Sequence, residues 1–264
     1  MREYVKKESR RIRLLGVRAK TAVFIFDDTK PLTFLKTFSW ADISTAVCRA
    51  RPESSALEYM KDIARLSGDP KVHGVIIVPP KHTNIQTLFD SIPVEKDVSC
   101  RSASAISAML CREKRAYLPC LAEGVMRILR YYNVDYSAKH VLLLGIHNDM
   151  RLLGQALINA GSIVTQTTGL AGDIERIASE SDIIISMTNT ASSMGKGFFR
   201  ENQVVIDLGL GKNSEGRAGD VCFDEAEKFV EGIFLREDGG FTELTDYILT
   251  EHVLKSAAAV IKKK

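Results

Sequence analysis

Residues 139–161, KHVLLLGIHNDMRLLGQALINAG, carry the clearest fold signal in the chain. Residues 141–144 are an unbroken apolar run, which is typical of a strand buried on both faces of a parallel sheet. Gly145 and a short polar loop follow, and apolar residues then recur at helical spacing until Gly161 ends the helix. A second apolar run at residues 162–165 completes a predicted βαβ unit.

The N-terminus of this helix is a candidate phosphate site, because its free backbone N–H groups and its dipole attract anions. The usual Gly-x-Gly-x-x-Gly motif is absent, since the next glycine after Gly145 is Gly154, which lies inside the helix. This stretch alone therefore leaves two interpretations open: a nucleotide-binding unit and a crossover that binds nothing.

The composition is that of a globular protein without a strongly charged partner. The 264 residues are 45% hydrophobic and 26% charged, and the net charge of +3 is too small to indicate nucleic-acid binding. No apolar run approaches the ~18–20 residues that span a bilayer, and the start of the chain lacks the apolar core of a secretory signal. We therefore expect two small domains, no nucleic acid or membrane partner, and a cytoplasmic location.

The five cysteines are scattered and include no Cys-x-x-Cys pair, so the sequence predicts neither a metal site nor a disulfide framework. The first 20 residues are rich in Lys and Arg. Such a segment is typical of a mitochondrial presequence, but Glu3 and Glu8 argue against one. The solvated face of a first helix is the favoured interpretation, and a mitochondrial location stays open.

Strand and helix patterns alternate along the chain, which predicts an α/β fold. Before a boundary at Pro119-Cys120 we expect strands at residues 21–26 and 73–78 and helices at residues 32–47, 54–66, 87–92 and 103–110. After it we expect a helix at residues 123–132, the βαβ unit, a helix at 173–179, strands at 182–186 and 203–208, and a last helix at 242–262.

Two segments of the second half are polar and glycine-rich, residues 186–196 and 209–219. Loops of this composition commonly line a ligand crevice at the carboxyl edge of a parallel sheet. Both segments are therefore candidates for the lining of a ligand crevice at that edge.

Several short motifs, in the right order and spacing, resemble those of the methylenetetrahydrofolate dehydrogenase/cyclohydrolase family. The family's Pro-Cys-Thr-Pro-x-Gly segment corresponds to PCLAEG at residues 119–124, and its nucleotide strand and turn correspond to residues 141–148. Its Val-Val-Ile-Asp-x-Gly strand corresponds to residues 204–209, and its Gly-Asp-Val-x-Phe segment corresponds to residues 219–223. The resemblance covers about residues 20–260.

The resemblance implies two α/β domains. Residues 1–120 would form the substrate-type domain, completed by the last helix at 242–264, and residues 121–241 a Rossmann-like domain with a parallel sheet that binds NADP or NAD. It also implies a folate-type substrate and a homodimer. The residues it implies for cofactor binding are Gly145, His147, Asn148, Arg151, Thr167, Thr168, Asp207 and Gly209.

The cofactor positions leave alternatives open. Arg151 stands where the family has its second glycine and would bind phosphate as a cation, whereas Asp149 would repel it. Residues 166–169 offer hydroxyl groups but neither an Arg for a 2′-phosphate nor an acid for a 2′-hydroxyl, so NAD and NADP both stay open. His147 is more typical of a solvated or capping residue than of a general base, and Asp207 equally fits a structural carboxylate.

The residues that carry the family's chemistry are not kept. Its Tyr-x-x-x-Lys falls on Phe34 and Phe38, its Gln falls on Val78, and the second Asp of Lys-Asp-Val-Asp-Gly falls on Ser99. Its Pro-Gly-Gly-Val-Gly-Pro-Met-Thr has become residues 238–245, DGGFTELT. Lys36, if it replaces the lost lysine, and Asp97 are the remaining catalytic candidates.

These losses affect the two reactions of the family differently. Hydrolysis needs a proton donor and acceptor, which Phe, Val and Ser do not supply. Hydride transfer chiefly needs two ligands held face to face. The sequence therefore favours an NAD(P)-dependent methylenetetrahydrofolate dehydrogenase without cyclohydrolase activity. The alternative is an inactive family member that serves as a binding or scaffold protein.

Overall fold

A computed structural model of the chain describes residues 7, 10, 14, 18–27, 29, 31–51, 54–80, 85–169, 172–214, 216–236 and 240–261. The expected basic first helix and the start of the segment at 238–245 fall largely outside them. The chain divides into two compact units. Unit 1 comprises Met1–Cys120 and Glu243–Lys264, and unit 2 comprises Leu121–Thr242.

Unit 1 contains a parallel three-stranded sheet. Its central strand β1 (Lys20–Ile25) lies between β2 (Ser44–Arg49) and β3 (Gly74–Val78). Alternate side chains of β1 point to opposite faces, so Ala22 and Phe24 pack in one hydrophobic cluster and Val23 and Ile25 in another. Helices can therefore cover both faces of the sheet, and β1 and β3 are nearly continuous apolar runs, whereas the edge strand β2 is partly exposed.

Different helices of unit 1 cover the two faces of this sheet. The cluster that holds Phe24 also contains residues of α3 (Ala56–Gly68) and α4 (Gln86–Phe89). The opposite cluster combines α2 (Phe34–Trp40) with residues of α10 (Phe241–Ile261). The 3₁₀ helix η1 (Val94–Lys96) and α5 (Ala103–Leu110) complete the elements of this unit in the described ranges.

The prediction of a helix at residues 32–47 is wrong in its second half. Helix α2 ends at Trp40, and Asp42, with φ 53, is in the left-handed region that continues no helix. The residues that follow form β2 instead, paired with β1 from Lys20↔Ser44 to Ile25↔Arg49. A helical pattern in the sequence was overridden by the backbone hydrogen bonds that an edge strand gains on this sheet.

Unit 2 contains a five-stranded parallel sheet in the order β10-β7-β6-β4-β5. Its strands are β4 (His140–Leu144), β5 (Ile163–Thr167), β6 (Ile183–Ser186), β7 (Val204–Asp207) and β10 (Gly232–Leu235). Strand β4 has β5 on one side and β6 on the other, so the connections that follow β4 and β5 run in opposite directions across the sheet. Such a switch point is where parallel sheets bind ligands.

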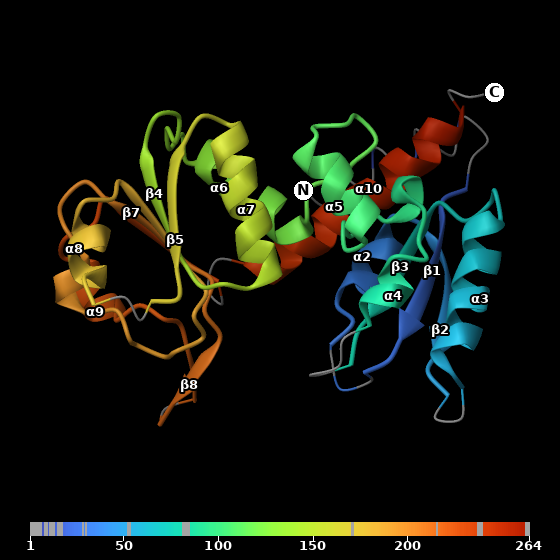
Figure 1. The fold of residues 1–264 in the computed structure, drawn as a ribbon, viewed down its shortest axis with the longest axis horizontal. Helices are drawn as coiled ribbons and strands as arrows, with labels where there is room; N and C mark the ends of the chain where they lie inside the picture. The colour runs from blue at the N-terminus through green and yellow to red at the C-terminus, as the bar shows by residue number, and fades with distance from the viewer. Residues whose placement is uncertain are drawn as a thin grey trace. The chain divides into compact units, whose positions relative to one another are not determined.

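Helices lie on both faces of the sheet of unit 2 (Figure 1). One face carries α6 (Cys120–Tyr131) and α7 (Asn148–Asn159), and the other carries α8 (Ile174–Ser179) and α9 (Phe223–Ala226). A hairpin of β8 (Gly211–Asn213) and β9 (Gly216–Ala218) projects from the connection after β7, and the 3₁₀ helix η2 (Lys196–Phe198) precedes β7. The expected α/β fold with a Rossmann-like second domain is confirmed, whereas β10, the hairpin and α9 had no counterpart in the sequence analysis.

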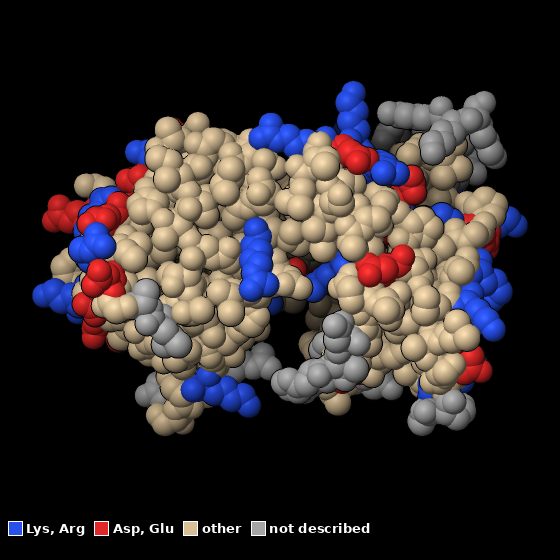
Figure 2. All heavy atoms as spheres, viewed as in Figure 1, with Lys and Arg blue, Asp and Glu red and all other residues tan. Residues whose placement is uncertain are grey.

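Within the described ranges, no helix combines the length and the apolar character needed to cross a bilayer. The same residues include no group of three or more His, Cys, Asp or Glu side chains placed to hold a metal ion. Figure 2 shows Lys and Arg side chains interspersed with Asp and Glu on the face it displays, in keeping with the small net charge of +3.

Candidate functional site

The turn at Gly145 brings three strand ends of unit 2 together. Gly145 has φ 123, and a Cβ atom built on it would lie 2.6 Å from the Met187 carbonyl oxygen. Only glycine therefore allows the ends of β4 and β6 to approach this closely. The Gly145 N–H donates to the Thr167 carbonyl at 2.8 Å, and the Gln166 side-chain amide donates to the Gly145 carbonyl at 2.8 Å, which joins the turn to β5.

Helix α7 begins directly after this turn. Its N-cap residue His147 has extended backbone, and its side chain makes no capping hydrogen bond. The Met150 and Arg151 N–H groups donate to the His147 carbonyl. The exposed Arg151 side chain donates to the Asn148 Oδ1 at 3.1 Å, so a cation lies on the first turn. This end of the helix can receive an anion both from its dipole and from a guanidinium group.

Asn189 joins the loops that follow β4, β6 and β7. Its Oδ1 accepts from the Leu210 N–H at 3.0 Å, and its Nδ2 lies 3.3 Å from the His147 Nε2. This contact joins the loop after β6 to the residue that precedes α7. Asn189 is left-handed, with φ 60, a conformation that asparagine tolerates better than most residues. Asn189 lies in a segment expected to be a polar loop, and no role was predicted for its side chain.

Asp207 holds the backbone of two loops. It is 1% exposed, and its carboxylate accepts from the N–H groups of Gly209, Asp220 and Val221 at 2.9, 3.1 and 2.9 Å. Burial raises the pKa of Asp207, and these backbone hydrogen bonds offset part of the rise. Its contacts are those of the structural carboxylate that the sequence left as an alternative.

Asp220 is a second buried carboxylate, which the sequence analysis did not single out. It accepts from the Ser186 Oγ at 2.6 Å and from the Thr188 and Thr190 N–H groups at 2.6 and 3.0 Å. It thereby fixes the path of the chain as it leaves β6. A Cβ on Gly209 would lie 2.3 Å from the Asp220 Oδ1, so the glycine lets the two loops meet. The available signal was the Gly-Asp pair in the segment at 219–223.

Three loops therefore meet at the carboxyl edge of the sheet of unit 2, where the ligand crevice is expected. Of the residues expected there, Gly145, His147, Asn148 and Arg151 lie on the first loop and the start of α7, and Gly209 lies on the loop after β7. Thr167 ends β5 and Thr168 is exposed just beyond it. The Asp207 side chain lies beneath the loops rather than on their surface.

The three positions of unit 1 on which the family's Tyr, Lys and Gln fall are packed in its core. Phe34, Phe38 and Val78 are 9%, 1% and 7% exposed and belong to one hydrophobic cluster. The two phenylalanine rings meet edge to face, with centroids 5.3 Å apart. Helical periodicity turns positions 34 and 38 of α2 toward α10 and the sheet, so neither ring faces solvent.

The two catalytic candidates of unit 1 are not brought into one site. Lys36 is on the exposed side of α2, where its Nζ lies 5.2 Å from the centre of the Trp40 ring. Asp97 is 0% exposed and accepts from the Ser99 Oγ at 3.1 Å and from the Arg101 and Ser102 N–H groups at 2.9 and 2.7 Å. These bonds hold the turn that leads into α5.

The relationship of the chain to known proteins follows from its second half. Residues 119–261 match the model of a family described as "Tetrahydrofolate dehydrogenase/cyclohydrolase, NAD(P)-binding domain". The chain belongs to the tetrahydrofolate dehydrogenase/cyclohydrolase family. The match covers more than half of the protein and confirms the family expected from its motifs.

Full-length relatives of the tetrahydrofolate dehydrogenase/cyclohydrolase family agree with this. The chain is 27% identical over 229 residues to the bifunctional protein FolD of Clostridium kluyveri, covering 84% of this chain and 79% of the relative. It is 29% identical to FolD of Lysinibacillus sphaericus, covering 78% and 73%. The structure of the Campylobacter jejuni bifunctional enzyme FolD superposes with a TM-score of 0.90 at 25% identity, covering 98% of this chain and 94% of that one.

The family assignment confirms a nicotinamide dinucleotide as the cofactor class of unit 2. The residues present fit such a group. The turn at Gly145 leads straight into a helix N-terminus, a cation lies on the first turn of that helix, and polar loops from two further strands surround it.

Proposed function

We propose that the chain is an NAD(P)-dependent dehydrogenase that oxidises 5,10-methylenetetrahydrofolate by hydride transfer and has no cyclohydrolase activity. The observation that carries the proposal is a contrast between the units. The loops of the crevice in unit 2 are joined by hydrogen bonds, whereas Phe34, Phe38 and Val78 lie in the apolar core of unit 1.

The residues of unit 2 would act by binding and orientation. Backbone N–H groups at the start of α7 and the Arg151 guanidinium would hold the diphosphate, and Thr188 and Asn189 would offer polar groups beyond β6. The cofactor supplies the hydride acceptor. Asp207 and Asp220 would keep the loops in place through their backbone hydrogen bonds, so that a reacting carbon is held in line with little reorganisation.

Loss of hydrolysis follows from the chemistry of unit 1. General acid–base catalysis contributes ~10²–10⁴ per group and needs a side chain that can exchange protons with the substrate. Two aromatic rings and a valine cannot do this, and the Asp97 carboxylate is already bonded to three donors in a fully buried position. Lys36 would have to leave the Trp40 ring to serve as the missing lysine.

Two assays on the purified protein test the proposal. With methylenetetrahydrofolate and either NAD or NADP, reduced nicotinamide should form, and its absorbance gives the rate. With methenyltetrahydrofolate alone, the loss of absorbance should not exceed the uncatalysed rate. Measurable hydrolysis would contradict the assignment of residues 34, 38, 78 and 99. If calorimetry shows no heat with NAD, NADP or a folate analogue, the scaffold alternative replaces the dehydrogenase.

The proposal includes a homodimer and the cytoplasmic location expected from the sequence. The edge strand β5, which includes the exposed Ile163, and the exposed Ile158 of α7 would offer a contact surface in unit 2. Sedimentation at micromolar concentration should give twice the chain mass of 29.2 kDa. A species of 29.2 kDa would reject the dimer.

A further inference from the structure

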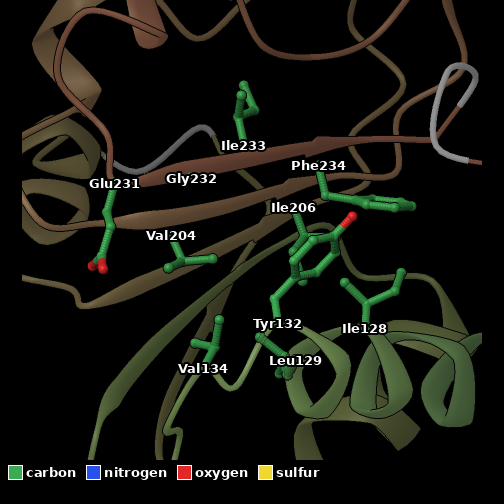
Figure 3. A pocket seen from close by; sticks show the side chains of 10 residues that line it. All are labelled: Ile128, Leu129, Tyr132, Val134, Val204, Ile206, Glu231, Gly232, Ile233 and Phe234. Atoms are coloured by element: carbon green, nitrogen blue, oxygen red, sulfur yellow. The ribbon is translucent and has the colours of Figure 1, made fainter.

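A groove of about 300 Å³ lies on the α6 side of the sheet of unit 2 (Figure 3). Val204 and Gly232 are the first residues of β7 and β10, and Glu231 precedes β10, so one end of the groove is at the amino edge of these strands. The crevice of the three loops is at the opposite, carboxyl edge. The groove is lined by Ile128, Leu129, Tyr132, Val134, Val204, Ile206, Glu231, Gly232, Ile233 and Phe234.

The groove has a rigid base and an open centre. Leu129 and Ile206 are 1% and 0% exposed and belong to the packed interior of the unit. Gly232 leaves open space at its own position, because a Cβ atom built there would meet no heavy atom within 4 Å. Tyr132 and Phe234 both line the groove, and Tyr132 is 61% exposed.

The size and lining of the groove indicate a small molecule. Its volume of about 300 Å³ is at the lower end of the ~300–1,000 Å³ typical of small-molecule sites. Aliphatic side chains dominate the lining, and the two aromatic rings offer faces for a flat ring system. Glu231 is the charged residue of the lining, and its carboxylate lies at the end of the groove away from Phe234 (Figure 3).

We propose that this groove is a second ligand site, which binds a small organic cation made of a flat apolar ring and an ammonium group. The ring occupies the space over Gly232 between Tyr132 and Phe234. The ammonium group reaches the Glu231 carboxylate at the amino edge of the strands. The site is independent of the proposed dehydrogenase reaction, since none of its residues lies on the loops of the crevice.

Calorimetry on the full chain with two probes of opposite charge tests the site: 2-(1-naphthyl)ethylamine and 1-naphthylacetate. The amine should bind saturably, one per chain, and about two- to fivefold more tightly than the carboxylate, the usual worth of one exposed ion pair. Glu231→Gln should remove this preference, whereas the matched change at another exposed glutamate of the unit, Glu201→Gln, should leave it intact.

Two further variants test the location. Gly232→Leu should fill the groove and abolish binding of both probes while leaving the binding of NAD and NADP unchanged. If circular dichroism shows that this variant does not fold, Tyr132→Ala takes its place, because Tyr132 is largely exposed. Amine binding that survives removal of the Tyr132 wall would overturn the proposal, as would equal binding of the two probes or no saturable binding. A Gly232→Leu variant that turns a dimer into a monomer would overturn it too, since a second copy would then cover the groove.

Discussion

Replacing Asp220 with asparagine is the sharpest test of how the crevice in unit 2 is built. The change keeps the size of the side chain but replaces one carboxylate oxygen with an N–H₂ group, which cannot accept a hydrogen bond. In the native protein the Asp220 carboxylate accepts hydrogen bonds from three donors: the Ser186 Oγ, the Thr188 N–H and the Thr190 N–H. Two of them share one oxygen, so the best arrangement of the new amide keeps those two and turns its N–H₂ group toward the Thr190 N–H.

The expected loss of stability follows from these three bonds. The bond to Thr190 is lost, at ~1.5–3 kcal/mol for a hydrogen bond to a charged group, and the other two weaken by roughly 0.5–1 kcal/mol each because their acceptor becomes neutral. The charge of Asp220 also contributes to the raised pKa of Asp207, so its removal offsets part of this loss. We therefore expect the free energy of unfolding of unit 2 to fall by ~2–4 kcal/mol.

Urea unfolding followed by circular dichroism gives the stability, and hydrogen exchange of the Thr188 and Thr190 amides gives the local effect. Both amides should lose protection, and dinucleotide affinity should fall because the loop after β6 is released. The control is Asp224→Asn, the same change at an exposed position in the first turn of α9, which should cost at most ~0.5 kcal/mol. Equal stability of the two variants, with unchanged exchange at Thr188 and Thr190, would refute the reasoning.

Three further changes have defined outcomes. Gly145→Ala forces a side chain into a left-handed turn 2.6 Å from the Met187 carbonyl oxygen and should lower stability by at least ~2 kcal/mol in thermal unfolding. The control Gly68→Ala, whose Cβ would have no atom within 4 Å, should change stability by less than ~1 kcal/mol. Burial, together with the charge of Glu243, raises the pKa of Asp246 from 3.8 to about 6 despite a hydrogen bond from Thr33. Between pH 4 and 6 the folded state therefore keeps a proton that the unfolded state releases, so stability falls as the pH rises through this window. Asp246→Asn should remove this fall and raise the free energy of unfolding at pH 7 by ~1–2 kcal/mol. Urea titrations at several pH values measure both effects. Arg151→Ala should weaken dinucleotide binding by ~1–3 kcal/mol in calorimetry, and unchanged affinity would mean that the guanidinium stays with Asn148.

Local patterns were sufficient wherever one element buries its own apolar residues. The run at residues 141–144 and the spacing that follows it predicted β4 and α7 within a few residues, and Ser55 with Glu58 forms the capping box that begins α3. Where a strand depends on its neighbour, the sequence was misleading. Residues 44–49 carry no strand signal of their own, and they form β2 because β1 presents an edge of unpaired backbone groups beside them.

The features of the candidate site also fall into those that local sequence patterns predicted and those that depend on distant partners. The sequence alone determined the α/β class, the position of the helix N-terminus after Gly145 and the family to which the motifs belong, since each depends on residues close together in the chain. Only the tertiary structure decided that Asn189 joins His147 to Leu210, that Asp220 holds the exit of β6, and that Phe34 and Phe38 lie in a core. The physical reason is that a hydrogen bond or a buried face depends on which partner folding brings to it. The side-chain partners lie 21 to 42 positions away for Asn189 and 30 to 34 for Asp220, and Phe34 and Phe38 pack with residues of the last helix, α10.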